Sequence, residues 1–235
     1  MYISKQVEMS DSKQNYNTIR SELLVDALPN LQNRLLLLDF DETLWLRNST
    51  EAFLGHTRPA WLVSLILSIV MLQRPVSRRL WPKLWISQKD WLRVGVITVL
   101  LPWSLPIWRR QVRRQKVGQE HQNTSLIRVL KSKKPSRVIV ISNGFHPIIA
   151  PLMESIDFPI ELLISAPLLT GAIWRAQGKS ANAEAILGKE ELDNACFLTD
   201  HIIDEDLLDR VGFGILCKWQ ESSFNQVGLS FKRNQ

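Results

Sequence analysis

The sequence is poor in cysteine and has no long apolar run at its start. Only two cysteines, Cys196 and Cys217, occur in 235 residues, and both lie in apolar stretches near the C-terminus. Two such residues do not make a disulfide framework or a cysteine-rich metal site, so a reducing compartment is expected. The first fifteen residues are polar, which argues against a secretory signal. These absences predict a cytoplasmic protein.

Acidic residues are almost absent from the segment between Arg74 and Lys116. This segment holds eleven basic residues and a single acid, Asp90, which gives it a charge of +10. The whole chain carries +6, so the remainder is mildly acidic. The charge is therefore concentrated in one part of the chain, and that part needs its own explanation.

Four short apolar runs predict strands of a parallel sheet. Each run is too short for a buried helix, and three of them end in polar residues. The runs are 35–38, 138–141, 195–198 and 214–217. Helical patterns at 147–156, 180–187 and 205–211 alternate with them. This alternation favours an α/β fold with a doubly wound parallel sheet.

Polar residues at the strand ends supply candidate catalytic groups. Asp39 and Asp41 follow the first run in Asp39-Phe40-Asp41-Glu42-Thr43, Ser142 follows the second, and Asp200 follows the third. Carboxyl ends of parallel strands meet at one edge of a sheet, so these side chains are expected to be neighbours. Two acids in a turn also suit a helix cap, and the strand before them is what favours chemistry.

Taken in order, these motifs resemble those of the haloacid-dehalogenase-like (HAD) superfamily. The segment 35–44 is similar to the first motif, and the other three correspond to Ser142, to Lys179 in Gly178-Lys179-Ser180, and to Asp200 with Asp204. The similarity covers roughly 33–44 and 135–216. The sequence departs from the family at Glu42, where glycine is common, and at Thr199 and His201, where glycine and serine often flank the acid. The second departure puts the metal site in doubt.

The resemblance implies a Rossmann-like core and a magnesium-dependent phosphatase. Asp39 would be the nucleophile that forms an aspartyl-phosphate, and Asp41 the general acid and base. Lys179 would offset charge and, with Ser142 and Asn143, bind the phosphoryl group. The Mg²⁺ ligands would be Asp39, the backbone carbonyl of Asp41 and Asp200, with Asp204 in support. Phosphotransfer to an alcohol uses the same intermediate and stays open.

Several of these residues also have a purely structural interpretation. Lys179 could be a solvated surface lysine, and Asp204 could be the N-cap of the helix that follows it. His201 is expected to be a loop histidine, because an oxygen-rich magnesium site has little need of imidazole. His146 is expected to begin a helix.

Composition divides the chain into three predicted parts. Residues 1–30 form a polar N-terminal tail and a short helix around 21–28, and residues 31–46 plus 123–235 form the HAD-like catalytic core. Residues 47–122 form a helical cap insertion that is rich in tryptophan and basic residues. In the family that the motifs resemble, a cap in this place closes over the site and selects the leaving group.

The insertion also suggests a partner. Its apolar runs, 61–72 and 94–101, fall short of the ~20 residues that span a bilayer, but tryptophans beside arginines fit a lipid–water interface. We expect contact with an anionic membrane surface through residues 61–116, peripheral on the inner face, with Trp103, Trp108 and the four arginines at 109, 110, 113 and 114 at the lipid. A cap whose tryptophans form its own core is the alternative. No nucleic-acid motif is present, so no nucleic acid is expected as a partner.

The texture of the insertion also resembles that of dehalogenase-like domains fused to membrane prenyltransferases. That resemblance implies a polyprenyl-linked phosphate as a substrate, beside a small phosphorylated molecule. A rival hypothesis comes from another class of protein. In it, the chain is a catalytically weak binding module that keeps the fold and docks on a membrane or a membrane enzyme.

Overall fold

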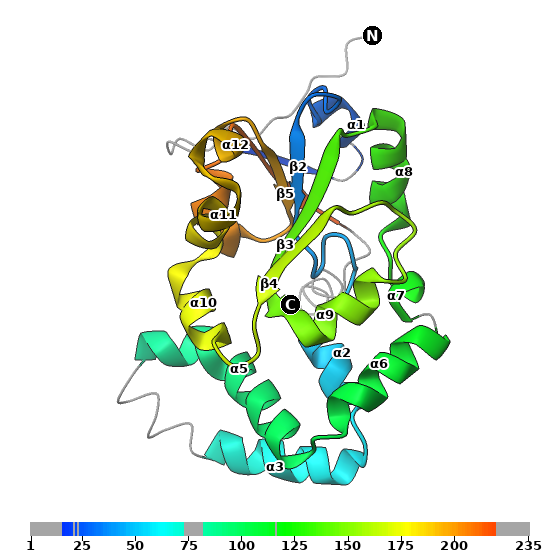
Figure 1. The fold of residues 1–235 in the computed structure, drawn as a ribbon, viewed down its shortest axis with the longest axis vertical. Coiled ribbons are helices and arrows are strands. Elements are labelled where there is room, and N and C mark those ends of the chain that lie inside the picture. The colour runs from blue at the N-terminus through cyan, green and yellow to red at the C-terminus, as the bar shows by residue number, and fades with distance from the viewer. Residues whose placement is uncertain (1–15, 21, 23, 73–81, 116, 220–235) are drawn as a thin grey trace, which may run out of the picture.

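The computed structural model describes residues 16–20, 22, 24–72, 82–115 and 117–219, which form one α/β fold (Figure 1). Six parallel strands make a single sheet in the order β1-β6-β5-β2-β3-β4. The strands are β1 (Tyr16–Arg20), β2 (Leu35–Leu38), β3 (Arg137–Phe145), β4 (Leu162–Ala166), β5 (Cys196–Thr199) and β6 (Phe213–Lys218). All four predicted strands are present.

Strand β2 shows why the sheet is covered on both faces. Successive side chains of a strand point to opposite faces, yet all four leucines of β2 are buried. Leu36 and Leu38 belong to one apolar core, whereas Leu35 and Leu37 belong to the other. A doubly wound parallel sheet, as predicted, accounts for a continuous leucine run.

Helices supply the apolar side chains on each face. The first core includes residues of α1 (Leu24–Ala27), α8 (Thr124–Lys133) and α9 (His146–Met153), and the second includes residues of α11 (Lys179–Leu187), α12 (Lys189–Asp193) and α13 (Glu205–Leu208). Helix α10 (Gly171–Gln177) and the 3₁₀ turn η2 (Ile202–Asp204) complete the core elements. Three of these, α9, α11 and α13, correspond to the predicted helical patterns.

The prediction of a polar tail was wrong for residues 16–20. They form β1, an edge strand whose backbone pairs in parallel with β6 from Tyr16↔Gly214 to Arg20↔Lys218. Only Tyr16 of this strand is buried, so the segment carries no apolar alternation. An edge strand gains its place from main-chain hydrogen bonds rather than from side-chain burial, and its sequence gives little sign of it.

The two segments that connect the insertion to the core lie side by side. Leu46 N donates to His121 O at 2.8 Å and Asn123 N donates to Leu44 O at 2.9 Å. Between these points the described chain forms α2 (Ser49–His56), α3 (Ala60–Leu72), α5 (Pro82–Leu100), α6 (Ser104–Gln115) and α7 (Val117–Glu120). We call this part the cap, and Figure 1 shows α3 at its far end from the sheet.

Two tryptophans attach the cap to the core. Trp91 Nε1 donates to Leu168 O at 2.8 Å, and Trp108 Nε1 donates to Ile148 O at 3.0 Å. Trp108 is buried between α6 and α9. The prediction that Trp108 meets lipid was therefore wrong, because its indole is enclosed and its N–H has a carbonyl partner.

Within the described residues, no single helix has the length and apolar character needed to cross a membrane. One pair meets those criteria jointly, namely residues 89–100 of α5 with α6, but a bend of 101° separates the two halves.

Candidate active site

The turn after β2 holds Asp39 at the edge of the sheet. Asp39 N donates to Leu198 O of β5 at 2.9 Å, so the strand ladder fixes its backbone. Leu44 N and Trp45 N both donate to Phe40 O, at 3.1 and 2.9 Å, which closes a helical turn around the acids. Glu42 lies in this turn with φ of 61°, a left-handed conformation that glycine adopts most easily. This backbone explains why glycine is common at that position in the family that the motif resembles.

Lys179 is the centre of a buried ionic network. Its Nζ lies 2.7 Å from Asp39 Oδ1 and 2.6 Å from Asp204 Oδ2, and only 4% of the residue is exposed. Gly178 precedes it with φ of 87°, and a Cβ there would lie 2.7 Å from Asp206 Oδ2. The glycine thus lets the chain turn into α11 beside Asp206. The alternative of a solvated surface lysine is wrong.

Asp204 acts on this network and not as a helix cap. It precedes α13 but makes no side-chain cap hydrogen bond. Its Oδ2 instead accepts from Lys179 Nζ and, at 2.7 Å, from the Thr199 hydroxyl, which also lies 3.3 Å from Asp39 Oδ2. The contacts show Asp204 positioning Lys179 and Thr199, while its support of a metal stays a prediction.

Asp200 is held by Thr43 across the edge of the sheet. Thr43 Oγ1 donates to Asp200 Oδ1 at 3.1 Å and accepts from Asp200 N at 3.0 Å. This pair joins the first and fourth motifs, which are 157 residues apart. Neither Thr43 nor Thr199 was predicted as a site residue. Their positions in the sequence could have pointed to them, because Thr43 lies in the acidic turn and Thr199 is the last residue of β5.

Asp41 is held by the first residue of the cap. Ser49 N donates to Asp41 Oδ1 at 2.6 Å and Ser49 Oγ donates to Asp41 Oδ2 at 3.1 Å. Ser49 begins α2, whose N-cap Asn48 accepts from Glu51 N. Sequence reasoning did not single out Ser49, although Asn48 followed by Glu51 is a helix-start signal. The cap therefore orients the Asp41 carboxylate, the predicted general acid and base, directly.

Ser142, Asn143 and Gly144 lie in the last part of β3, where the pairing with β4 shifts register between Ser142 and Phe145. Ser142 Oγ accepts from Gly144 N at 3.0 Å, and a Cβ on Gly144 would lie 3.0 Å from Asp41 Oδ2 and 2.5 Å from Ile149 Cδ1. Only glycine lets the backbone approach this closely. Asn143 Oδ1 is buried without a hydrogen-bond partner among the described residues, which marks a place for a ligand or water.

Burial controls the protonation of Asp39, Asp41 and Asp200 at the edge of the sheet. It raises the pKa of Asp39, Asp41 and Asp200 to about 7 each, against the opposing attraction of Lys179. Burial alone would lower the pKa of Lys179, but Asp204 and Asp39 raise it above its usual range. One lysine faces more negative charge than it can neutralise, so the site favours a cation.

These residues fit a magnesium ion. Mg²⁺ prefers oxygen ligands and keeps several waters, and Asp39, Asp200 and the backbone carbonyl of Asp41 are oxygen donors at one edge of the sheet. Among the described residues no three His, Cys, Asp or Glu side chains already surround a metal position. The expected magnesium ligands are only two carboxylates and one backbone carbonyl, so this site does not need three such side chains.

We expect magnesium to stabilise the protein more at about pH 8 than at about pH 5.5. Carboxylates whose folded pKa is about 7 bind protons that the unfolded chain releases near 4, so the metal-free fold loses stability as pH rises through that window. Metal competes with those protons. Thermal unfolding with and without magnesium measures the difference, and an equal shift in Tm at both pH values would contradict it.

The two histidines beside the motifs have structural partners. His201 caps η2 and its Nδ1 accepts from Ile203 N at 3.1 Å. His146 begins α9 and its Nδ1 lies 3.0 Å from Ser165 Oγ. The predictions of a loop histidine and of a helix-starting histidine are confirmed.

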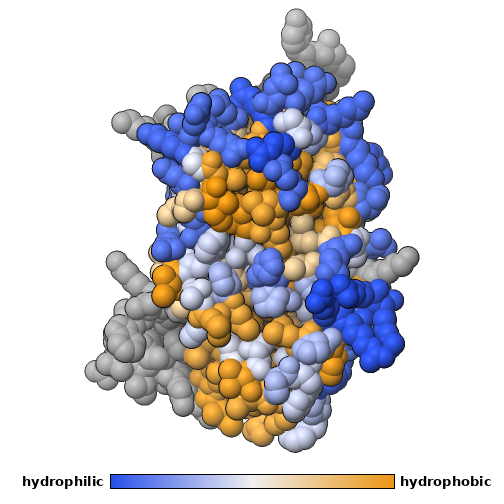
Figure 2. Space-filling view, viewed as in Figure 1, coloured by the Kyte–Doolittle hydropathy of each residue, from blue (hydrophilic) through white to orange (hydrophobic). Residues whose placement is uncertain are grey.

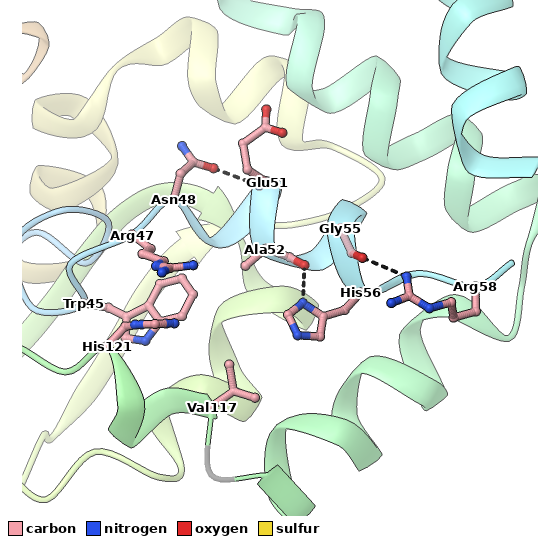
Figure 3. A pocket seen from close by; sticks show the side chains of 10 residues that line it. All are labelled: Trp45, Arg47, Asn48, Glu51, Ala52, Gly55, His56, Arg58, Val117 and His121. Carbon is pink, nitrogen blue, oxygen red and sulfur yellow. Dashed lines mark hydrogen bonds between the residues drawn. The ribbon is translucent and has the colours of Figure 1, made fainter. Parts of the chain in front are cut away.

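A pocket of about 510 Å³ is lined by α2 and by residues that follow the acidic turn after β2 (Figure 3). Its cationic and imidazole groups are Arg47, Arg58, His56 and His121. Burial lowers the pKa of His121, and Arg47 lowers it further. Asn48, which adjoins Ser49, is on the pocket wall, whereas Asp39 and Lys179 are not. The pocket is thus adjacent to the acidic cluster without including it.

Comparison with known proteins supports the fold. No protein-family model and no curated protein matches the sequence. A phosphoserine phosphatase solved as a phospho-aspartyl intermediate analogue is 17% identical with a TM-score of 0.51, and the match covers 85% of this chain and 99% of that one. Apo phosphoserine phosphatase is 13% identical with a TM-score of 0.49, over 84% and 98% of the two chains.

A HAD family hydrolase from Salmonella enterica subsp. enterica serovar Typhi is also similar. It is 12% identical with a TM-score of 0.48, over 85% of this chain and 66% of that one. At these identities the likeness to the phospho-aspartyl analogue structure shows a shared fold. The chain therefore shares the α/β fold of that phosphatase, and the predicted Rossmann-like parallel sheet is confirmed.

Proposed function

We propose that this protein is a magnesium-dependent phosphatase that acts through an aspartyl-phosphate on Asp39. The observation that carries the proposal is the buried network in which Lys179 joins Asp39 to Asp204 at 2.7 and 2.6 Å. Burying a lysine with two carboxylates costs desolvation free energy. The network lies at the end of the leucine strand β2, beside Asp41 and Asp200, and this arrangement supplies the nucleophile, the proton donor and the positive charge that phosphoryl transfer to a carboxylate needs.

Each residue has a defined part in the reaction. Asp39 attacks phosphorus, and the bond from phosphorus to the leaving oxygen breaks. Asp41 gives that oxygen a proton and then takes one from the water that hydrolyses the acyl phosphate, so one group serves both steps. Lys179, Ser142 and Asn143 hold the phosphoryl oxygens. Asp39, Asp200 and the backbone carbonyl of Asp41 would hold magnesium, which would offset the negative charge of the phosphate and of the nucleophile.

The direct test is turnover of a chromogenic phosphate monoester by the purified protein. The expected result is hydrolysis that requires magnesium and stops when a chelator is added. Activity that a chelator leaves unchanged would rule out the metal-dependent mechanism. No turnover across a broad panel of phosphate esters, together with tight binding of a membrane or membrane enzyme, would support the binding-module alternative.

The leaving group is the finer part of the proposal. A small phosphorylated molecule fits the general chemistry, and a polyprenyl-linked phosphate also fits because the cap exposes apolar side chains. A substrate screen in detergent and in lipid vesicles separates the two. Preference for a lipid-linked ester over its water-soluble head group would select the second.

Asp41→Asn is expected to lower kcat by about 10² to 10⁴-fold, because asparagine cannot transfer the proton. Magnesium affinity should persist, since the ligand at this position is the backbone carbonyl. Ser49→Ala is the companion variant, because it removes one of the two hydrogen bonds that hold Asp41 and leaves the acid. Its loss should be smaller, and a wild-type rate for Asp41→Asn would remove Asp41 from the mechanism.

A further inference from the structure

The far end of the cap exposes large apolar side chains in a group. Trp61 is 69% exposed and Val99 is 77% exposed. The full group, which we call the apolar tip, is Trp61, Leu65, Ile69, Val99, Leu100 and Trp103. An exposed apolar cluster of this size marks an interaction site more often than a plain solvent face.

The members of the apolar tip lie on one surface. Trp61, Leu65 and Ile69 are spaced four residues apart and so share one face of α3. Val99, Leu100 and Trp103 lie where α5 turns into α6, at the 101° bend. Trp103 Nε1 donates to Arg58 O at 3.0 Å, which brings this bend beside the start of α3. Figure 2 shows the apolar surface of the cap at the end of the molecule that α3 occupies.

Charge around the apolar tip is positive. Helix α3 has no charged residue, and from Trp91 to Leu105 the single charge is Arg93. Helix α6 then presents Arg109, Arg110, Arg113 and Arg114, all exposed. Arg109 and Arg113 pair with Glu154 of the core, whereas Arg110 and Arg114 form no ion pair within the described residues. Of the four arginines expected at the lipid, Arg110 and Arg114 are therefore the two that we place there.

The spacing of apolar and basic groups matches the depth profile of a lipid surface. Arg110 follows Trp103 by seven positions, which is about 10 Å along a helix. Indole rings and aliphatic side chains enter the boundary between head groups and acyl chains, and guanidinium groups remain at the phosphates. A protein partner would need matching acids for the arginines and a complementary apolar face, whereas an anionic bilayer offers both without a specific sequence.

We propose that the apolar tip docks the protein on the surface of an anionic lipid bilayer, with Arg110 and Arg114 at the phosphate level. Only the apolar tip enters the interface, because α5 and α6 also pack against the core, and the bent pair does not cross the bilayer. This docking does not depend on catalysis. The apolar tip is formed by α3 and the α5–α6 bend, and none of the carboxylates at the sheet edge belongs to it. Hydrolysis of a soluble ester should therefore survive its loss.

The test is sedimentation of the full chain with vesicles of phosphatidylglycerol and phosphatidylcholine, compared with pure phosphatidylcholine. Leu65→Glu and Val99→Glu place a charge in the apolar tip and should each lower the bound fraction about tenfold or more, because a carboxylate would then have to enter the apolar boundary of the bilayer. Ile186→Glu on α11 is the matched control, because Ile186 is 50% exposed and Leu65 is 51% exposed. It should bind as the wild type does.

Salt should separate the contribution of the arginines from that of the apolar residues. Binding through the arginines should weaken as salt rises, because surface attraction is screened beyond about 10 Å at 0.1 M salt, whereas binding through the apolar tip should persist. Arg110→Gln with Arg114→Gln should remove most of the preference for anionic vesicles, because it removes the two positive charges placed at the lipid phosphates. Failure of the wild type to sediment at low salt would overturn the proposal. So would vesicle binding that Leu65→Glu and Val99→Glu leave intact, or a dimer in solution that these two variants dissociate. In each case, retained hydrolysis of a soluble phosphate ester would show that the docking proposal had failed while the proposed function had not.

Discussion

Asp39→Asn is expected to abolish turnover of a phosphate monoester, with a loss of about 10⁴-fold or more, because the amide cannot act as the nucleophile. Asp39 is the acid that follows β2 directly and whose Oδ1 contacts Lys179 at 2.7 Å. Asparagine keeps the size of the side chain and the acceptor oxygen, and Lys179 retains Asp204 as a charged partner. The loss should therefore be one of chemistry.

Three measurements make this result specific. Thermal unfolding should show Asp39→Asn folded, and magnesium should still shift its Tm to a smaller extent. Acid-quenched wild-type enzyme should carry labelled phosphate that hydroxylamine releases, as an acyl phosphate does, and Asp39→Asn should carry none. If labelled phosphate appeared on the Asp39→Asn variant, or if its rate equalled that of the wild type, the nucleophile would have to be another residue.

The acids of the site could be predicted from sequence because their signal is local. A run of leucines that stops at Asp39 defines both a strand and its end, and parallel topology then brings Asp39, Ser142 and Asp200 to one edge. The same argument found the four strands that carry strong apolar runs. Strand β4 (Leu162–Ala166) was not found in this way, although it pairs with β3. Leu162 is 40% exposed, so β4 is not buried along its whole length.

The residues that hold the acids could not be predicted in the same way. The bonds from Thr43 to Asp200 and from Ser49 to Asp41 depend on how the turn after β2 packs against the end of β5 and the start of α2. A single threonine or serine has no sequence pattern that reveals such a contact. The cap shows a related limit. Trp103 and Trp108 lie in the same tryptophan-rich, basic stretch of sequence. Trp108 is nevertheless enclosed against α9, whereas Trp103 is exposed at the bend. Composition alone could not separate the two.

Lys179→Met is expected to destabilise the fold by about 3–5 kcal/mol at pH 8, since it leaves buried carboxylates without their counter-ion. Asp39 and Asp204 both contact Lys179 Nζ, and Asp39 is already raised to a pKa of about 7 by burial. Without the lysine the carboxylates must take up protons to stay buried. The native state then binds more protons than the unfolded chain, so the loss should shrink as pH falls toward about 5.

A surface lysine provides the control for this result. Lys131 Nζ lies 2.7 Å from Asp157 Oδ2, nearly the same separation as in the buried network, but its side chain is 52% exposed. Lys131→Met should cost about 0–1 kcal/mol, with no such dependence on pH, because water screens the pair. Chemical denaturation of both variants at two pH values measures the difference. The double variant Lys179→Met with Asp204→Asn should recover part of the lost stability, because it removes one of the two unpaired carboxylates. Equal costs for the two lysines, or a cost for Lys179→Met that does not change with pH, would mean that Lys179 is held by packing, and that its charge neither stabilises the acids nor prepares Asp39 for a phosphate.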